Sequence, residues 1–249
     1  MLAYTGALGL GLCSTQCWGI KKMDFDEWKP LAEQGMAEAQ HNLGLMFSSG
    51  KDISRDDQEA VKWYRLAAEQ GFAESQTNLG LMYGKGQGVE QNFMEAVKWY
   101  RLAAEQGLAQ AQHNLGVMYG RGQGVTKNYQ EAFWWFKLSA EQGYGQAQYN
   151  LGLMYSRGEG VPRSDQEAVK WYRLSAEQRI PGAQSNLGLM YEKGLGVEQD
   201  YVEAHKWFNI AGVNGNAVGK KNANIIEKKM APGQIIVAIG LARKWMEKI

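Results

Sequence analysis

Residues 71–106 read GFAESQTNLGLMYGKGQGVEQNFMEAVKWYRLAAEQ, and this stretch recurs along the chain at a fixed interval of 36 residues. No insertion or deletion breaks the register between Gly35 and Trp207. A period of this length is typical of stacked repeats, in which each unit buries its hydrophobic face only against its neighbours. The tripeptide Asn-Leu-Gly marks the same step five times, at Asn42, Asn78, Asn114, Asn150 and Asn186.

Each half of the stretch has the residue spacing of an amphipathic helix. Leu79, Met82 and Tyr83 fall on one helical face in the first half, and Val97 and Tyr100 do so in the second. Small residues alternate with these large ones, as close helix packing requires. The sequence therefore predicts one helix–turn–helix unit per repeat.

Glycine and capping residues predict where these helices begin and end. The run 85–89 (KGQGV) separates the two helices, because glycine permits the positive φ that ends a helix. Asn92 is the predicted N-cap of the second helix, and Glu95 follows three residues later as in a capping box. Gly107 ends that helix and leads into the next unit.

The repeat resembles a known family. Its motifs are Ala-x-Ala-Gln-x-Asn-Leu-Gly-x-Met-Tyr, Gly-x-Gly-Val and Glu-Ala-x-x-Trp-Tyr-x-x-Ala-Ala-Glu-Gln-Gly. Over about residues 24–230 they resemble the Sel-one-like repeat (SLR), a relative of the tetratricopeptide repeat. The resemblance implies an all-α, right-handed α-solenoid whose first helices line a concave face. It also implies an adaptor function, often in bacterial proteins that are secreted or periplasmic.

We expect a single array and no separate domain. Residues 24–35 look like a degenerate second helix, and 234–249 has the pattern of a final amphipathic helix. Such atypical ends cover the last core faces of a solenoid. The predicted solenoid spans 21–249, with repeats at about 35–70, 71–106, 107–142, 143–178 and 179–214 and a C-terminal cap at 215–249.

The N-terminal segment, residues 1–20, is apolar and uncharged from residue 2 onward. It resembles the hydrophobic region of a signal peptide, but lacks a positively charged start and a small-x-small cleavage site. It favours export to the periplasm or the medium over a cytoplasmic location. An apolar N-terminal helix and an extension from a misassigned start codon stay open as alternatives. No other stretch is long enough to span a bilayer, and Cys13 and Cys17 predict a local disulfide or two idle thiols.

Neither composition nor motifs point to an enzyme. The net charge of +1 argues against nucleic acid as a partner. His41 and His113 lie two repeats apart, too far to share a metal ion. The glycine-rich loops close helices instead of opening them after a strand, so they are turns and not phosphate-binding loops. We therefore expect no catalytic residue, no metal and no cofactor.

Candidate partner-binding residues come from comparing the repeats with one another. A position that stays fixed serves packing, whereas one that varies on an exposed face is free to serve recognition. The most variable position on the predicted outer face of the first helix is occupied by His41, Thr77, His113, Tyr149 and Ser185.

An apolar ridge runs beside this variable position and includes Leu81, Val117 and Leu153. The ridge either packs between successive first helices or forms an apolar strip on the concave surface. The asparagines beside it either connect successive helices or bind a peptide backbone: Asn78, Asn114 and Asn150.

Trp134 breaks the pattern of its position, which is lysine in the other repeats. It is either a hot spot for a partner or a local variant.

The sequence predicts a non-catalytic scaffold that binds a protein or peptide on its concave face. An envelope enzyme or small-molecule binder is the alternative, because some cysteine-rich SLR relatives have been linked to β-lactam binding. This chain lacks their repeated cysteine pairs. A self-associating array is a third possibility, and the oligomeric state stays open.

Overall fold

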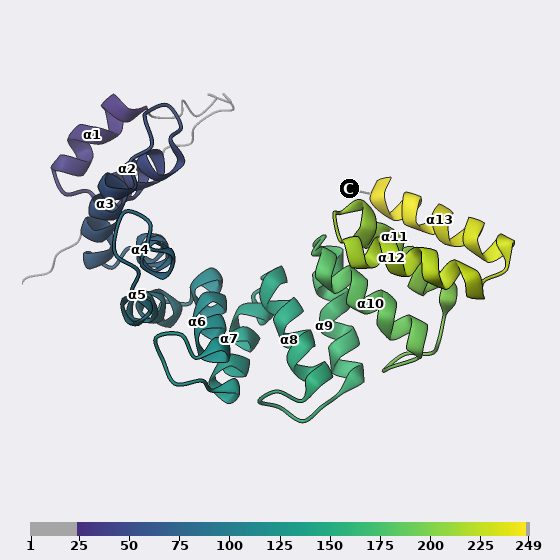
Figure 1. The fold of residues 1–249 in the computed structure, drawn as a ribbon. Helices are drawn as coiled ribbons and strands as arrows, with labels where there is room; N and C mark the ends of the chain where they lie inside the picture. The colour runs from purple at the N-terminus through teal and green to yellow at the C-terminus, as the bar shows by residue number, and fades with distance from the viewer. Residues whose placement is uncertain (1–23, 248–249) are drawn as a thin grey trace, which may run out of the picture.

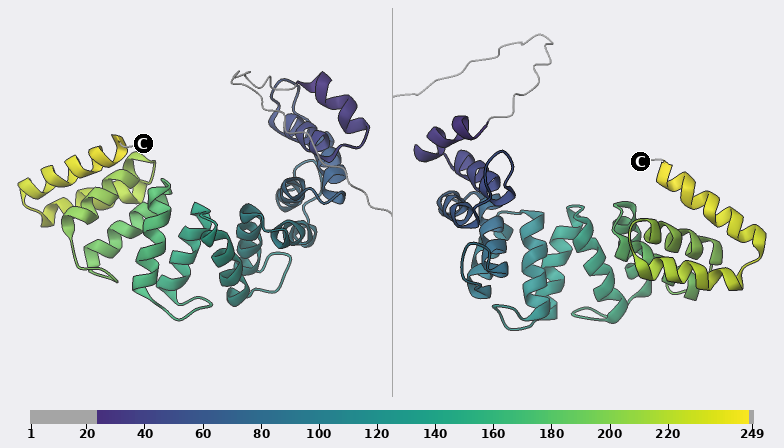
Figure 2. Two further views of the ribbon diagram at one scale, coloured as in Figure 1. Left: turned by 180° about the vertical axis from the view of Figure 1, so that it is seen from behind. Right: turned by 45° about the horizontal axis from the view of Figure 1, so that its top comes forward.

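The computed structural model describes residues 24–247, and over this range it consists of thirteen α-helices and one short 3-10 turn, with no strand. The helices stack in chain order into an open arc, with α1 at one end and α13 at the other (Figure 1, Figure 2). The all-α solenoid predicted from the repeat is confirmed. The apolar segment 1–20, with Cys13 and Cys17, lies outside the described residues.

Helices alternate along the chain as the first and second helix of each repeat. We call the side of the array on which the first helices lie the first-helix side. A boundary is the region where two successive first helices meet across the second helix that lies between them. The first helices are α2 (Ala37–Ser49), α4 (Ala73–Lys85), α6 (Ala109–Arg121), α8 (Gly145–Arg157) and α10 (Pro181–Lys193). The second helices are α3 (Asp57–Glu69), α5 (Phe93–Glu105), α7 (Tyr129–Glu141), α9 (Asp165–Glu177) and α11 (Tyr201–Val213).

The ends of the array depart from this pattern. The N-terminal helix α1 (Phe25–Glu33) takes the place of a second helix, as predicted for a degenerate unit. At the other end α12 (Ala217–Ile226) leads through the 3-10 turn Glu227–Lys229 into α13 (Pro232–Glu247), which packs on α11. No described helix combines the length and the apolar character needed to cross a membrane.

The second helices begin at side-chain caps. The Asn92 side chain accepts hydrogen bonds from the backbone N–H groups of Met94 and Glu95, so the predicted N-cap is confirmed. The predicted capping box is wrong here, because the Asn92 N–H donates to the Tyr83 carbonyl instead. The Glu95 carboxylate lies 3.5 Å from the Lys98 amine.

In each loop after the first, one position must be glycine because backbone of the preceding second helix lies against it. Gly88 has a φ of +67°, and a side chain on it would collide with the backbone carbonyl of Asp57 at the start of α3. The equivalent residue of the first repeat is Asp52, with a φ of +70°.

A ladder of buried glutamines connects the repeats. The Gln76 amide donates to the Ala68 carbonyl at 3.1 Å, and its oxygen accepts from the Gln106 amide at 2.8 Å. Burying an amide without partners costs about 1–3 kcal/mol, so these bonds specify the register of the stack. The same position in the other repeats is occupied by Gln40, Gln112, Gln148 and Gln184, each buried.

Candidate functional site

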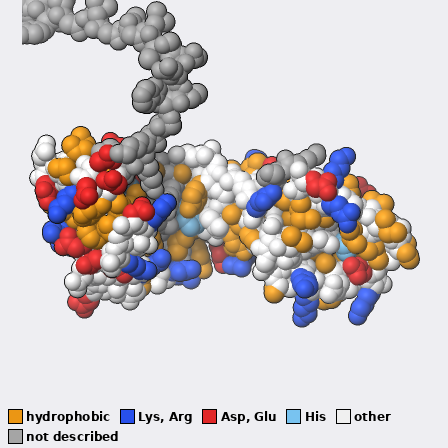
Figure 3. Space-filling model, turned by 90° about the horizontal axis from the view of Figure 1, so that it is seen from above, with side chains coloured by type: hydrophobic (Ala, Val, Ile, Leu, Met, Phe, Trp, Pro, Cys, Tyr) orange, Lys and Arg blue, Asp and Glu red, His pale blue; other side chains and the backbone are white. Residues whose placement is uncertain are grey.

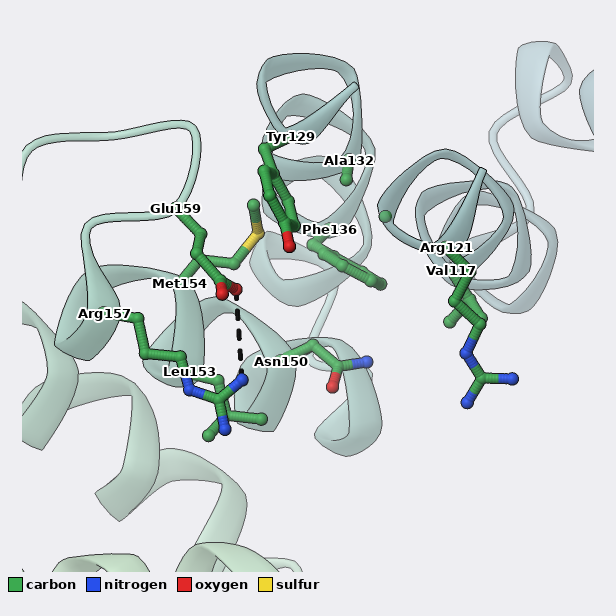
Figure 4. Close-up of a pocket in the computed structure, with 11 residues that line it drawn as sticks. Val117, Arg121, Tyr129, Ala132, Phe136, Asn150, Leu153, Met154, Arg157 and Glu159 are labelled. Carbon is green, nitrogen blue, oxygen red and sulfur yellow. Dashed lines mark ion pairs between the residues drawn. The ribbon is translucent and has the colours of Figure 1, made fainter. Parts of the chain in front are cut away.

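Two pockets of similar construction open on the first-helix side. The α4–α6 pocket has a volume of about 350 Å³ and includes Leu81, Tyr100 and Asn114. The α6–α8 pocket has a volume of about 270 Å³, and Figure 4 shows the rings of Tyr129 and Phe136 lying between its flanking helices. A shift of 36 residues converts nearly every lining residue of the first pocket into one of the second.

The predicted apolar ridge lies at the mouths of these pockets. Leu81 and Val117 line the α4–α6 pocket, and Val117 and Leu153 line the α6–α8 pocket. Val117 also packs against the core that contains Leu151 and Met154. Each of these three side chains is half-buried between helices and also lines a pocket.

The variable position is not the exposed recognition surface that its variability indicated. Thr77 and Ser185 are only 2% and 7% exposed, and the Thr77 hydroxyl donates to the Ala73 carbonyl inside its own helix. Tyr149 is the largest occupant, and the residue that its ring approaches in the next repeat is Gly182, where a Cβ would lie 3.0 Å from the ring.

The two histidines of this position are held between repeats in the same way. The Nδ1 atom of His41 lies 2.8 Å from the Ser75 hydroxyl, and Nε2 of His113 lies 3.0 Å from the Asn150 amide nitrogen. Burial lowers the pKa of His113 below its ordinary value, although a hydrogen bond to Asn114 offsets part of the effect. Burial also lowers the pKa of His41, and nearby glutamates oppose this.

Two of the three predicted asparagines reach into the preceding repeat. Asn150 reaches back to His113, and Asn78 hydrogen-bonds the Tyr64 hydroxyl of the preceding repeat. Asn114 lines the α4–α6 pocket, and its side-chain oxygen lies 3.3 Å from Nδ1 of His113. Asn78 and Asn150 thus connect neighbouring repeats, whereas Asn114 and Asn150 border the pockets.

A serine hydroxyl distinguishes two kinds of boundary. At the α2–α4 boundary the Ser48 and Tyr64 hydroxyls lie 3.0 Å apart, and Asn78 bonds the same tyrosine. At the α8–α10 boundary the Ser156 and Tyr172 hydroxyls lie 3.1 Å apart. Burial raises the pKa of both tyrosines, and these hydrogen bonds offset part of the shift. We call these the outer boundaries.

Glycine replaces the serine at the α4–α6 and α6–α8 boundaries, which we call the central boundaries. Gly84 lies beside Tyr100, and Gly120 lies over α7, beside Ala132 and near Phe136. Burial raises the pKa of Tyr100, and no hydrogen bond offsets the shift. The rings of Tyr100 and Phe136 therefore each border a pocket, and neither is bridged by a hydroxyl group from the first helix of its own repeat.

The first residue of the second helix differs in the same way. At the α2–α4 boundary Asp57 forms an ion pair with Arg55 at 2.9 Å, and Asp165 forms the equivalent pair with Arg163 at 3.0 Å. The central boundaries have aromatic residues at this position, and both line the pockets: Phe93 and Tyr129.

Basic side chains flank the two pockets. Lys85 and Arg121 border the α4–α6 pocket, and Arg121 and Arg157 border the α6–α8 pocket. In Figure 4 these two arginines lie on opposite sides of the α6–α8 pocket, and Arg157 pairs with Glu159 at 4.0 Å. Seen from above, hydrophobic, basic and acidic side chains are interspersed over both arms of the arc (Figure 3).

Trp134 lies on α7 and lines neither pocket. It is 50% exposed and packs edge-to-face on Trp135, with ring centroids 4.3 Å apart. In the preceding repeat the equivalent Lys98 covers Trp99, with its amine 5.4 Å from the ring. The Trp134 ring thus takes the place over Trp135 that the Lys98 amine has over Trp99.

The repeats match a known family. A family model of the Sel1 repeat matches five segments: residues 37–72, 73–108, 109–144, 145–179 and 181–216. The chain belongs to the Sel1 repeat family. Sel1 repeats generally mediate protein–protein interactions, and the fold is typically a non-catalytic scaffold.

Solved Sel1 repeat structures share this arrangement. The chain is similar to c5321, a protective antigen of uropathogenic Escherichia coli with an SLR fold, at 40% identity and a TM-score of 0.85. The match covers 90% of this chain and 48% of the antigen, so the chain spans about half of that protein's length. A Sel1 repeat protein from Oxalobacter formigenes is 36% identical, with a TM-score of 0.74 and coverage of 90% of this chain and 87% of that one. No curated protein matches the chain in a sequence comparison.

Within residues 24–247 there is no group of three or more His, Cys, Asp or Glu side chains arranged to hold a metal ion. The remaining histidine, His205, is fully buried and its Nε2 lies 2.9 Å from the Glu227 carboxylate. This contact joins α11 to the 3-10 turn of the C-terminal cap.

Proposed function

We propose that this Sel1 repeat protein is a non-catalytic scaffold that binds a protein partner on its first-helix side, the concave side that the family resemblance implies. The observation that carries the proposal is the pair of pockets between α4, α6 and α8, bordered by Leu81, Val117 and Leu153. Half-buried apolar side chains beside an open pocket can bury further surface when a partner binds.

The repeat supports this assignment by separating folding from recognition. The fixed positions, such as Gln76 and Leu79, are buried and hold neighbouring helices together. The pocket mouths combine apolar and charged side chains, as the surfaces of non-obligate interfaces do. A binding role uses only these exposed groups and needs no catalytic constellation.

Site-specific photo-crosslinking in cells that express the chain tests the proposal. A crosslinking residue at Lys85 on α4 should capture one defined protein, whereas the same residue at Lys98 on α5 should not; both lysines are exposed. Substitution of Leu81, Val117 and Leu153 by serine should abolish the capture. Circular dichroism of the triple variant must show that it stays helical.

Two results would overturn the proposal. One is capture from Lys98 and not from Lys85, which would place the partner on the second-helix side. The other is undiminished capture by a folded triple variant, with Leu102→Ser on α5 as the control. Leu102 is 40% exposed, so Leu102→Ser removes an apolar side chain of the same kind from the second helix α5.

A further inference from the structure

The two central pockets are joined through shared residues. Val117 and Arg121, both on α6, line the α4–α6 pocket and also the α6–α8 pocket. Packed helices have axes about 8–10 Å apart, so we take the repeat spacing along the array as about 10 Å. A ligand long enough to reach both pockets therefore meets α6 in the middle, with one pocket on either side.

This spacing suits an extended peptide. A polyproline II segment rises about 3.1 Å per residue and returns to the same face every third residue, which is about 9 Å along its axis. Side chains at positions i and i+3 would therefore point into successive pockets. An α-helix rises only about 1.5 Å per residue, so it would need about six or seven residues to cover the same distance.

The interior of both pockets suits apolar side chains. Phe93 and Tyr100 line the first pocket, and Tyr129 and Phe136 line the second. Glycine at residues 84 and 120 leaves out the serine that bridges to the tyrosine at the outer boundaries. The outer boundaries also have a paired aspartate where the central ones have Phe93 and Tyr129.

The rim is basic. Three cations, Lys85, Arg121 and Arg157, border the two pockets, against one acid, Glu159. Among residues 24–247 neither Lys85 nor Arg121 has an ion-pair partner, and both are exposed. A cation at a helix C-terminus gains stability from the helix dipole. That gain explains a basic residue at the end of α4 or α6 and leaves its charge available to a ligand.

We propose that the α4–α6 and α6–α8 pockets form one composite site for an extended acidic peptide segment, which places two apolar side chains three residues apart in the two pockets. The proposal rests on the proposed function and names the class of partner segment. Arg121 contacts the acidic residues between the two apolar side chains, and Lys85 and Arg157 contact those on either side.

A peptide array tests this specificity with the full chain. The probes are hexapeptides with two leucines among four acidic residues, with the leucines two, three or four positions apart, and matched peptides in which lysines replace the acids. The labelled chain should prefer the acidic peptides with leucines three positions apart. Fluorescence anisotropy with acetyl-Asp-Leu-Asp-Glu-Leu-Asp-amide then gives the affinity of each variant.

The chain's own outer boundary supplies the variant that closes a central pocket. Gly120→Ser together with Phe136→Tyr copies the Ser156–Tyr172 pair into the α6–α8 boundary, so the variant uses a combination the fold already contains. We expect it to weaken peptide binding at least tenfold, and Arg121→Gln to weaken it about fivefold at low salt. Ser156→Gly, at an outer boundary, should leave the affinity unchanged.

Other results would overturn the composite site. They are equal binding of all leucine spacings, preference for the lysine peptides, full binding by the closed variant, or no binding by any array peptide. If protein capture from Lys85 persists alongside any of these, the proposed function stands and only the peptide class is wrong. If that capture also fails, the scaffold proposal fails on its own test.

Discussion

The central and outer boundaries of the array share one backbone geometry but have different side chains at equivalent positions. All ten helices of the five repeats have thirteen residues, and the second glycine of each later loop keeps a φ between +67° and +72°. The outer boundaries have serine over tyrosine and an Arg–Asp pair. The central boundaries have glycine and an aromatic residue at the same positions. A solenoid can therefore change the surface of a boundary at a few positions without changing how its helices stack.

The largest expected effect tests whether the backbone is in fact common to both kinds of boundary. In Gly124→Ala the new methyl group would collide with the Phe93 carbonyl, and in Gly196→Ala with the Asp165 carbonyl. Each substitution should lower the free energy of unfolding by at least about 3 kcal/mol, because backbone on both sides must move. Urea unfolding measures both.

Gly107→Ala is the matched control, because its φ is also positive but no atom lies within 4 Å of the added Cβ. It should cost only about 1–2 kcal/mol of backbone strain. Clearly different losses for Gly124→Ala and Gly196→Ala would show that the two kinds of boundary differ in their backbones too.

Smaller changes in stability, opposite in sign to each other, should follow when side chains are exchanged between the two kinds of boundary. Ser156→Gly removes a hydrogen bond to Tyr172 and places glycine inside a helix, so it should destabilise the chain by about 1–2 kcal/mol. Gly120→Ser with Phe136→Tyr should stabilise it by about 0.5–1 kcal/mol, because it adds that hydrogen bond and removes a glycine from a helix. Thermal unfolding monitored by circular dichroism compares the two, and a loss of stability in the double variant would contradict the copied geometry.

The sequence predicted the fold because its strongest signals are local and repeated. The 36-residue spacing of Asn78, Trp99 and their equivalents defines the helix pairs, and the cap at Asn92 defines a helix start. The glutamine ladder escaped prediction, although Gln76 and Gln106 recur as regularly, because only the stacked structure brings them together.

The candidate site was harder to predict because variability has two causes. Thr77 and Ser185 are buried in the stack, so variation at their position does not by itself mark an exposed surface. Glycine at residues 84 and 120 marks the open pockets, because serine at the equivalent outer positions bonds a tyrosine hydroxyl. The sequence alone does not show that this serine and this tyrosine lie opposite each other. Repeat-to-repeat differences locate a site only after each position is assigned a neighbour.

Acid should destabilise a central boundary more than an outer one through its histidine. The pKa of His113 is lowered by burial, so the folded chain binds fewer protons there than the unfolded chain as the pH falls below about 6.5. Stability associated with neutral His113 is therefore present at pH 7 and is lost on acidification. His113→Gln should show a smaller fall in Tm between pH 7.5 and pH 5 than the native chain does.

His41→Gln is the comparison at the outer boundary. Glu74 and Glu38 oppose the effect of burial on the pKa of His41, so its removal should change the acid sensitivity less. A larger change for His41→Gln than for His113→Gln would reverse this order.

The smallest expected effect concerns Trp134 on the second-helix side. Trp134→Lys restores the lysine of the other repeats, which there covers a tryptophan and pairs with a glutamate, as Lys98 does with Trp99 and Glu95. Such exposed contacts change stability by less than about 1 kcal/mol. Affinity for the acidic hexapeptide should stay the same, and a loss of binding would place Trp134 in the site.

A methyl NMR titration with acetyl-Asp-Leu-Asp-Glu-Leu-Asp-amide tests the central claim most directly. The claim predicts shifts of the Leu81, Val117 and Leu153 methyl groups, largest at Val117 because it borders both pockets. The equivalent methyl groups at the array ends, Leu45 and Leu189, should stay in place. Equal shifts along the whole ridge, or shifts confined to second-helix leucines such as Leu102, would contradict it.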